Sequence, residues 1–471
     1  MSAATAPQLV RALGLWGAIA INVANMIGTG VFLKTRVMTC NVGSPLLVLG
    51  VWVAAGLLVL AGTFSYAEVA AMIPEAGGEY AFLRRAYGRV TGFLFGWTSF
   101  AIYKTGSQAA LAVGFAIFLN VALGGGLDRE LVGLDLGSVH LALSGIGLVA
   151  LAAIWSVAYI NCRSVVTGGR TAIVLTGAKV VLLAALALGA FAFARGRFGH
   201  LALSSSGATC EGVAASARGG VAGFGAAMLG ALWAYDGWAN VAPLAGEIKN
   251  PARDLPRAFL GGMLVVGALY LAVNLAYFYV LTPAEVGSVS TTSSVASEVM
   301  RRFVGPAAVT VAAVALMLSA FGSLQASSIT GARIPFAMAR EGLFPRALGA
   351  VSKGSHVPAR AVIAQAAWSS VLALSGSYDT LTDSAVFAVW LFYGLTAGTV
   401  FVFRRTLPAA ERPYHALGYP WLPALFVIVA FALIANTFQA TPRLALTGVA
   451  IMLAGLPLYV YFARQLKLTR P

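Results

Sequence analysis

Two interruptions lie inside long apolar runs of this sequence, and both carry residues that could bind a small charged molecule. The first run contains Ile27, Gly28, Thr29 and Gly30, and the sixth contains Trp233, Ala234, Tyr235, Asp236 and Gly237. Glycine costs a helix about 1 kcal/mol relative to alanine, and in an apolar medium a break is tolerated where it lines a cavity. Amides at a half-helix N-terminus bind carboxylates, and released carbonyl groups accept hydrogen bonds from an ammonium group. The two interruptions therefore predict a two-sided site for a molecule that carries both groups.

Two lysines also lie inside apolar runs, where an ionisable side chain is costly and usually functional. Lys179 lies about ten residues beyond Arg170, roughly 15 Å along a helix, which is too deep for its ammonium group to reach the interface easily. Lys104 lies in the third run, and two interpretations of it stay open. Its ammonium group pairs with Asp236, which would close the site to cationic side chains, or it extends to the cytoplasmic interface.

The composition is typical of a protein with many membrane-spanning helices. Hydrophobic residues make up 59% of the 471 residues and charged residues 10%, against roughly 25% charged residues in a soluble domain. Twenty of the 31 basic residues lie on one side of the apolar runs and nine on the other. Because basic loops stay in the cytoplasm, we expect a multi-pass protein of the plasma membrane with both termini cytoplasmic. Twelve spans are predicted, at 12–33, 45–72, 90–123, 138–160, 168–194, 221–246, 258–281, 306–338, 358–376, 382–403, 421–438 and 444–463.

Other polar residues near these runs have more ordinary interpretations. Segment 74–89 is amphipathic and is predicted to lie along the cytoplasmic interface. Ser319, Ser323 and Tyr393 are interpreted as packing residues on buried helix faces, with a role in a pocket or gate as the alternative. The last group comprises acids near arginines at cytoplasmic span ends, interpreted as ion-pair partners or inside gates: Glu68, Glu247 and Asp254.

The remaining residue types predict neither catalysis nor a metal or cofactor. Cys40, Cys162 and Cys210 do not form a disulfide framework and are interpreted as separate thiols. The four histidines lack the spacing of metal ligands. Because no Ser/His/Asp or Cys/His constellation is present either, we do not expect an enzyme.

The motifs at both interruptions resemble those of a known family. The sequence IGTGVF at 27–32 is followed by LWAYDGWANVAPLAGEIKNPARDLPRA at 232–258. Further similarity lies in FSYAEVAAMIPEAGGEYAFLRRAYG at 64–88 and LSAFGSLQASSITGARIPFAMAREG at 318–342. Over roughly residues 10–440 the chain resembles the amino acid–polyamine–organocation superfamily and, within it, a bacterial-type member of the L-type amino acid transporters.

This resemblance implies a fold. It is an all-α polytopic membrane protein with 12 transmembrane helices, built as a LeuT-type five-plus-five inverted repeat in which helices 1 and 6 are broken. The single transport domain would comprise repeat one at about 12–194, repeat two at about 221–403, and two appended helices at about 421–463.

The resemblance also implies roles for the residues at the interruptions. The amides of Gly28, Thr29 and Gly30 match a motif that contacts the substrate carboxylate. Carbonyl groups at Ala234 and Tyr235 would meet the substrate amine, and Trp233 occupies the position of a gating aromatic. Asp236 matches an acid found in members that handle basic amino acids and cystine.

In sodium-coupled relatives an ion bridges the first and eighth spans, and Lys179 resembles a replacement for that ion. Its ammonium group is predicted to bind freed carbonyls of the first span together with Ser327 or Ser328. The implied activity is sodium-independent L-amino acid transport by alternating access, as an exchanger. A proton-coupled amino acid or polyamine symporter, with Lys179 as the proton site, is the alternative.

No glycoprotein partner is expected. Eukaryotic members of the family bind a single-span heavy chain through a cysteine between the third and fourth spans. The external cysteine of this chain, Cys210, lies after the fifth span instead.

Overall fold

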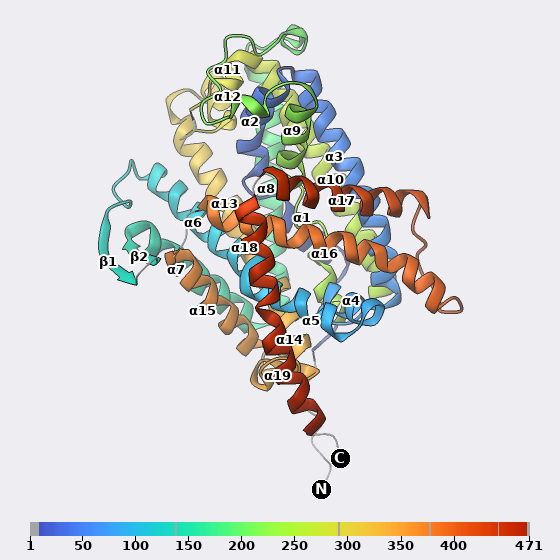
Figure 1. Ribbon diagram of the computed structural model, residues 1–471. Coiled ribbons are helices and arrows are strands. Elements are labelled where there is room, and N and C mark those ends of the chain that lie inside the picture. Colours follow the sequence, from blue (N-terminus) through green and yellow to red (C-terminus); the bar gives the residue numbers. More distant parts are fainter. Residues whose placement is uncertain (1–8, 137–138, 291–292, 376–377, 441, 469–471) are drawn as a thin grey trace.

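The chain folds almost entirely into helices in the computed structural model, which describes residues 9–136, 139–290, 293–375, 378–440 and 442–468 (Figure 1). Within these residues, eight helical segments are long and apolar enough to cross a membrane, or nine if the bent pair within 15–42 is counted as one span. This is the architecture of a polytopic membrane protein. The twelve-span count and the inverted repeat stay predictions.

The elements fall into two groups by length. The longer helices are α1 (Leu15–Met26), α2 (Gly30–Val42), α3 (Pro45–Met72), α5 (Arg89–Thr98), α6 (Lys104–Ala122), α7 (Gly145–Arg163), α8 (Val165–Phe193), α9 (Gly220–Ala234), α10 (Pro251–Val280), α13 (Ala308–Gly331), α15 (Ala359–Ser375), α16 (Tyr378–Thr406), α17 (Trp421–Ala440), α18 (Pro442–Leu453) and α19 (Gly455–Leu468). The short elements are α4 (Glu79–Tyr87), η1 (Ser99–Tyr103), β1 (Glu130–Leu136), β2 (Val139–Ser144), η2 (Phe198–Ala202), η3 (Ala215–Ala217), η4 (Ala242–Glu247), α11 (Pro283–Gly287), α12 (Val295–Val304), η5 (Gly305–Ala307), α14 (Arg333–Arg340) and η6 (Arg346–Gly349).

Both predicted interruptions are breaks between elements. Helix α1 ends at Met26 and α2 begins at Gly30, with the two axes bent by 42°. Helix α9 ends at Ala234, and turns lead from there to η4. Helix α2 packs against α9, while α1 packs against α8, α10 and α13. The first break is therefore surrounded by elements that are distant in the sequence.

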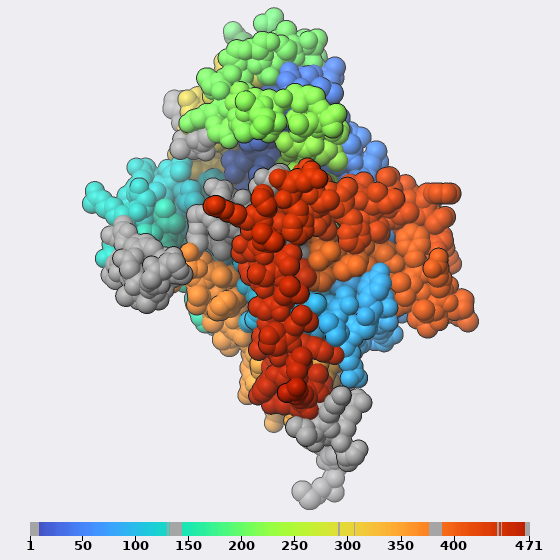
Figure 2. Space-filling view, viewed as in Figure 1, coloured from blue at the N-terminus to red at the C-terminus, as the bar shows by residue number. Residues whose placement is uncertain are grey.

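The helical body has a buried centre and a lipid-exposed periphery. In the apolar segment Ala308–Arg340, formed by α13 and α14, 61% of the most apolar window is buried. The corresponding shares are 17% for Trp421–Gln439 and 22% for Ala445–Leu466. Figure 2 shows these C-terminal helices, in red, lying across the outside of the molecule. Most side chains of α13 therefore belong to the interior, whereas α17 to α19 contribute only a few, such as Phe426, which packs against Trp238.

One segment differs from the all-helical expectation. Strands β1 and β2 form an antiparallel hairpin in which Asp135 lies opposite His140. The span predicted at 138–160 is consequently shorter, because α7 begins at Gly145. The stretch from Val139 to Ser144 alternates apolar and small or polar residues, a period of two that favours a strand over a helix.

The interpretation of the cysteines as separate thiols is wrong for two of them. Cys40, in the last turn of α2, and Cys210, in the loop between η2 and η3, form a disulfide with their Cα atoms 5.7 Å apart. The two positions are separated by 170 residues, so no local spacing marks the pair. Beside the disulfide, the backbone amide of Gly219 donates to the Asn41 carbonyl at 2.6 Å. The end of α2 is thus fastened to the segment that leads into α9.

Candidate functional site

The first turn of α2 lies inside the protein, with Gly30 and Val31 buried. Helix α2 begins at Gly30, and the side chain of the preceding residue, Thr29, does not cap it. The first N–H groups of a helix lack partners within it and, together with the helix dipole, favour a carboxylate. Gly28, Thr29 and Gly30 all line an adjoining cavity of about 50 Å³. The Gly28 amide donates to the Met26 carbonyl at 2.8 Å, so a small carboxylate in this cavity would meet the amides of Thr29 and Gly30 first.

The two breaks pack directly against each other, and two glycines make this possible. A Cβ atom on Gly30 would lie 2.6 Å from the Cβ atom of Ala234, and one on Gly237 would lie 2.6 Å from the Asn25 carbonyl oxygen. Gly237 also has a φ of +92°, which glycine adopts without steric cost. A larger residue at either position would push the breaks apart, so these glycines set the width of the site.

A tyrosine that the sequence did not single out joins the two breaks. The hydroxyl oxygen of Tyr270, on α10, lies 2.9 Å from the carbonyl oxygens of both Met26 and Ala234. A hydroxyl has one hydrogen to donate, so it serves one carbonyl at a time. The carbonyl of Ala234, predicted to meet a substrate amine, thus already has a partner, although its second lone pair remains. No local pattern distinguishes Tyr270 among the 15 tyrosines.

Lys179 binds the freed carbonyls of the first break. Its Nζ atom donates to the carbonyl oxygens of Ala24 at 3.1 Å and Ile27 at 2.7 Å, and to the hydroxyl oxygen of Ser323 at 2.7 Å. The lysine is 1% exposed. A Cβ atom on Gly322 would lie 2.7 Å from its Cε atom, so this glycine provides the space through which the side chain reaches α13.

The serines that surround this lysine differ from those predicted. Ser327 and Ser328 are not among the hydrogen-bond partners of Lys179 in the described part of the chain; Ser323, one helical turn earlier, is. The Ser323 hydroxyl oxygen also lies 2.9 Å from the Ala24 carbonyl and 3.0 Å from the Ile27 carbonyl, and it donates to one of them at a time. Ser319 donates to Gly28 at 2.9 Å. Two serines interpreted as packing residues therefore hold the break, because the break lies level with the middle of α13 rather than with its later turns.

The predicted binding residues divide into two sets around the cavity. Six of them line it: Gly28, Thr29, Gly30, Trp233, Ala234 and Asp236. The other four, Ile27, Tyr235, Gly237 and Lys104, are not lining residues. The ring of Tyr235 turns away to pack against Trp52 and Tyr270. The cavity wall also includes residues that the sequence did not reveal, such as Asn25, Ser107 and Leu111.

Lys104 and Asp236 do not form an ion pair within the described residues, so the predicted pairing is wrong. Lys104 Nζ donates to Asn240 Oδ1, and the Tyr393 hydroxyl donates to Asp236 Oδ1 at 2.8 Å. Tyr103 connects the two sides, with its hydroxyl 3.2 Å from Asn240 Oδ1 and 3.0 Å from the Tyr393 hydroxyl. The alternative interpretation is wrong too, because Lys104 is 2% exposed and does not reach the interface. Neutral polar groups bind each charge separately.

The segment before α1 and the segment after the second break are joined by backbone hydrogen bonds, and an ion pair connects the latter to α14. The amide of Leu13 donates to the Glu247 carbonyl at 2.9 Å, and that of Lys249 donates to the Leu13 carbonyl at 2.8 Å. The Glu247 carboxylate accepts from Arg333 Nε at 2.6 Å and Nη2 at 2.9 Å. The side chains of both partners are at most 2% exposed. The predicted pairing of Glu247 with an arginine is confirmed.

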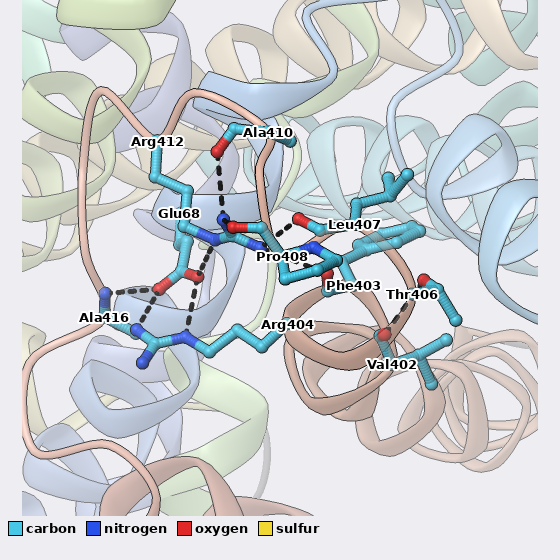
Figure 3. Close-up of polar contacts among 10 residues, drawn as sticks. All are labelled: Glu68, Val402, Phe403, Arg404, Thr406, Leu407, Pro408, Ala410, Arg412 and Ala416. Carbon is cyan, nitrogen blue, oxygen red and sulfur yellow. Dashed lines mark hydrogen bonds and ion pairs between the residues drawn. The ribbon is translucent and has the colours of Figure 1, made fainter.

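A second ionic cluster ties α3 to the end of α16 (Figure 3). The Glu68 carboxylate accepts from Arg404 Nε at 3.0 Å and Nη2 at 2.7 Å, and from the backbone amide of Ala416 at 2.6 Å. Arg412 lies 3.4 Å from the same carboxylate, and it also donates to four backbone carbonyls of the 403–410 segment. The predicted pairing of Glu68 is therefore confirmed, and Asp254 likewise pairs with Arg253 at 2.8 Å.

A larger cavity of about 420 Å³ lies next to the 50 Å³ cavity at the breaks, and Thr29 lines both. Its walls come from α2, α6, α13 and the segment at 293–297 that begins α12. These walls are mainly apolar, with three serines on the α12 side. A solute that leaves the 50 Å³ cavity past Thr29 would enter this larger space.

Comparison with known proteins places these features in one family. The amino acid permease family matches residues 13–462. The chain is 29% identical over 454 residues to the serine/threonine exchanger SteT of Bacillus subtilis, covering 96% of each chain. It is 30% identical over 457 residues to the b(0,+)-type amino acid transporter 1 of Mus musculus, covering 97% of this chain and 88% of that one. It is 26% identical over 456 residues to the human cystine/glutamate transporter, covering 97% and 86%.

These matches cover both breaks, Lys179 of α8 and the ion pairs of Glu68 and Glu247. They therefore extend over nearly the whole chain and are not limited to one motif. They confirm the family resemblance of the motifs. The chain therefore belongs to the amino acid permease family of membrane transporters and is not an enzyme.

Proposed function

We propose that this protein is a sodium-independent L-amino acid exchanger of the plasma membrane that works by alternating access. The substrate carboxylate binds at the amides of Gly28, Thr29 and Gly30. The substrate amine binds at carbonyl groups of the second break, beside Trp233. Movement of the two broken helices against the remaining helices then exposes the site to either side of the membrane.

The position of Lys179 is the observation that carries sodium independence. Its ammonium group lies among the carbonyls of Ala24 and Ile27 and the hydroxyl of Ser323. Carbonyl and hydroxyl oxygens released by a broken helix are the ligands that bind Na⁺ in transporters with such breaks. A fixed ammonium ion at this place supplies the same positive charge and leaves no need for a dissolved cation.

The relatives support amino acids as the substrate class and exchange as the mode. One of them is a serine/threonine exchanger that matches over 96% of both chains, and others transport amino acids. Asp236 in the cavity wall adds an acid that could bind a cationic side chain. Neutral L-amino acids are therefore the first substrates to test, with cationic ones second.

Counterflow in proteoliposomes tests the proposal. Vesicles loaded with unlabelled L-serine are expected to take up labelled L-serine at the same rate in sodium and in choline buffer. Vesicles without internal amino acid are expected to take up little. Uptake into empty vesicles driven by a proton gradient would instead establish the symport alternative. Competition by a panel of amino acids then defines the side-chain preference.

We also propose that the transporter acts without a heavy-chain partner and with both termini in the cytoplasm. Cys210 is already bonded to Cys40, so it has no thiol for a link to another chain. The remaining free cysteine of the described residues, Cys162, lies in the last turn of α7. Electrophoresis of the membrane protein without reductant is expected to show no covalent adduct.

A further inference from the structure

Glu79 is a buried acid that the site described above does not use. It is the first residue of α4, it is 3% exposed, and its Oε2 atom has no hydrogen-bond partner within the described residues. Glu75, four residues earlier, has a side chain that is 40% exposed and pairs with Arg84 and Arg85. An ionised carboxylate buried without a partner is strongly unfavourable. Glu79 therefore needs either a proton or a compensating charge.

Gly77 and Gly78, directly before α4, bring Glu79 close to the segment that follows the second break. The amide of Gly77 donates to the Pro243 carbonyl at 3.2 Å. A Cβ atom on Gly78 would lie 2.6 Å from the backbone nitrogen of Pro243, so only glycine allows this close approach. Pro243 belongs to η4, which follows Asp236 and Asn240 in the chain. The first turn of α4 is thus held against the segment that carries the acid of the binding cavity.

The charges around Glu79 do not balance. Among the described residues, Lys104 is the cation that acts on it, and Asp236 is a second acid. Two tyrosines, Tyr66 on α3 and Tyr103 on η1, complete the titratable groups that interact with it. Two elements that pack against α4 also carry arginines, and these are engaged elsewhere: Arg333 of α14 pairs with Glu247, and Arg404 of α16 pairs with Glu68. With both acids ionised, the cluster carries one excess negative charge.

The excess can be removed in two ways. A proton on Glu79 neutralises it, and so does a positive side chain that enters the cavity beside Asp236. Burial raises the pKa of Glu79 to about 7, although the positive charge of Lys104 opposes this rise. A proton is therefore held and released within the physiological pH range.

We propose that Glu79 is a proton-binding site whose proton exchanges for the positive side chain of a cationic amino acid. With a neutral substrate the carboxyl group holds the proton. When a cationic side chain binds beside Asp236, the proton leaves Glu79 for solvent, and the total charge of Glu79, Lys104, Asp236 and the bound side chain stays the same. This inference rests on the proposed amino acid transport.

The ratio of cationic to neutral uptake tests it. Proteoliposomes that contain the full-length protein and unlabelled L-serine are offered labelled L-arginine or labelled L-serine from about pH 6 to about pH 8. Over this range the ionised fraction of a carboxyl group with a pKa of about 7 rises about tenfold. The wild-type arginine-to-serine ratio is expected to rise by a similar factor. Glu79→Gln, which is permanently neutral, is expected to show a low ratio that does not change with pH.

Glu75→Gln is the matched control, because it removes an exposed acid from the same segment and is expected to follow the wild-type pH profile. A Glu79→Gln ratio that rises with pH as in the wild type overturns the proposal. If Glu79→Gln does not fold, Glu79→Asp keeps a titratable group and is expected to keep a pH-dependent ratio; a flat ratio in that variant overturns the proposal.

The wild-type protein separates this inference from the proposed function. Exchange of serine with an arginine-to-serine ratio that is constant across the pH range, or with no arginine uptake at any pH, overturns the role of Glu79 alone. Absence of all amino acid exchange overturns the proposed function as well.

Discussion

Replacement of Lys179 by methionine removes the charge at the first break and keeps most of the side-chain volume. Three hydrogen bonds from its ammonium group are lost, to Ala24, Ile27 and Ser323. Hydrogen bonds to charged groups contribute about 1.5–3 kcal/mol each. The desolvation of a buried ammonium ion opposes that contribution by several kcal/mol. Ser323 and Ser319 still donate to the Ile27 carbonyl, so it is not left without a partner. The net change in the free energy of unfolding is therefore expected to stay within about 2 kcal/mol.

The effect on exchange is expected to be larger than the effect on folding. If one charge-assisted bond has to form again in every transport cycle, its loss of about 1.5–3 kcal/mol slows exchange by about ten- to a hundredfold. Serine counterflow measures this rate, and the melting temperature in detergent measures stability. Ser327→Ala is the control, because this buried serine does not bind Lys179 in the described structure. A Lys179→Met protein that exchanges at more than half the wild-type rate refutes the reasoning, and one that aggregates in detergent shows a structural role instead.

Three further substitutions test the geometry of the site. Gly30→Leu is expected to abolish exchange because its Cβ atom would lie 2.6 Å from that of Ala234. Gly50→Leu, at a position with open space around it, is expected to retain exchange. Normal serine uptake by Gly30→Leu would contradict the carboxylate site. Tyr270→Phe removes the hydroxyl between the breaks and is expected to lower stability by about 1 kcal/mol and to slow exchange several-fold. Tyr277→Phe removes a buried hydroxyl that has no partner among the described residues and is expected to change little. Equal counterflow rates in the two tyrosine variants would count against the bridging role. Lys104→Gln removes the cation of the buried cluster and is expected to increase arginine uptake relative to serine; an unchanged ratio in the competition assay would mean that Lys104 does not control charge selectivity.

The sequence predicted the two breaks because their signals are local. Glycines and an aspartate within apolar runs are unfavourable in a continuous helix wherever that helix lies. The partners of those breaks depend on how helices align, and that is not a local property. Ser319, Ser323 and Ser327 lie four residues apart on one face of α13, so their spacing does not tell which of them lies level with Ile27.

Other differences have the same origin in long-range packing. Opposite charges in apolar runs suggest a direct pair, but here Asn240 and Tyr393 bind Lys104 and Asp236 separately. Because these partners are uncharged, the distribution of charged residues in the sequence does not reveal them. Tyr270 contacts both breaks because α10 packs against α1, α2 and η4, and its sequence neighbours give no indication of this.

The Cys40–Cys210 disulfide also marks one face of the molecule chemically. Disulfides persist in oxidising compartments and are reduced in the cytosol, which supports the proposed orientation, with the end of α2 and the loop before α9 outside the cell. The distribution of basic residues indicates the same orientation from an unrelated property, the retention of cationic loops in the cytoplasm. A membrane-impermeant thiol reagent applied to intact cells therefore reports the orientation of the protein in the membrane. After external reduction it is expected to label Cys40 and Cys210, while Cys162 stays unlabelled.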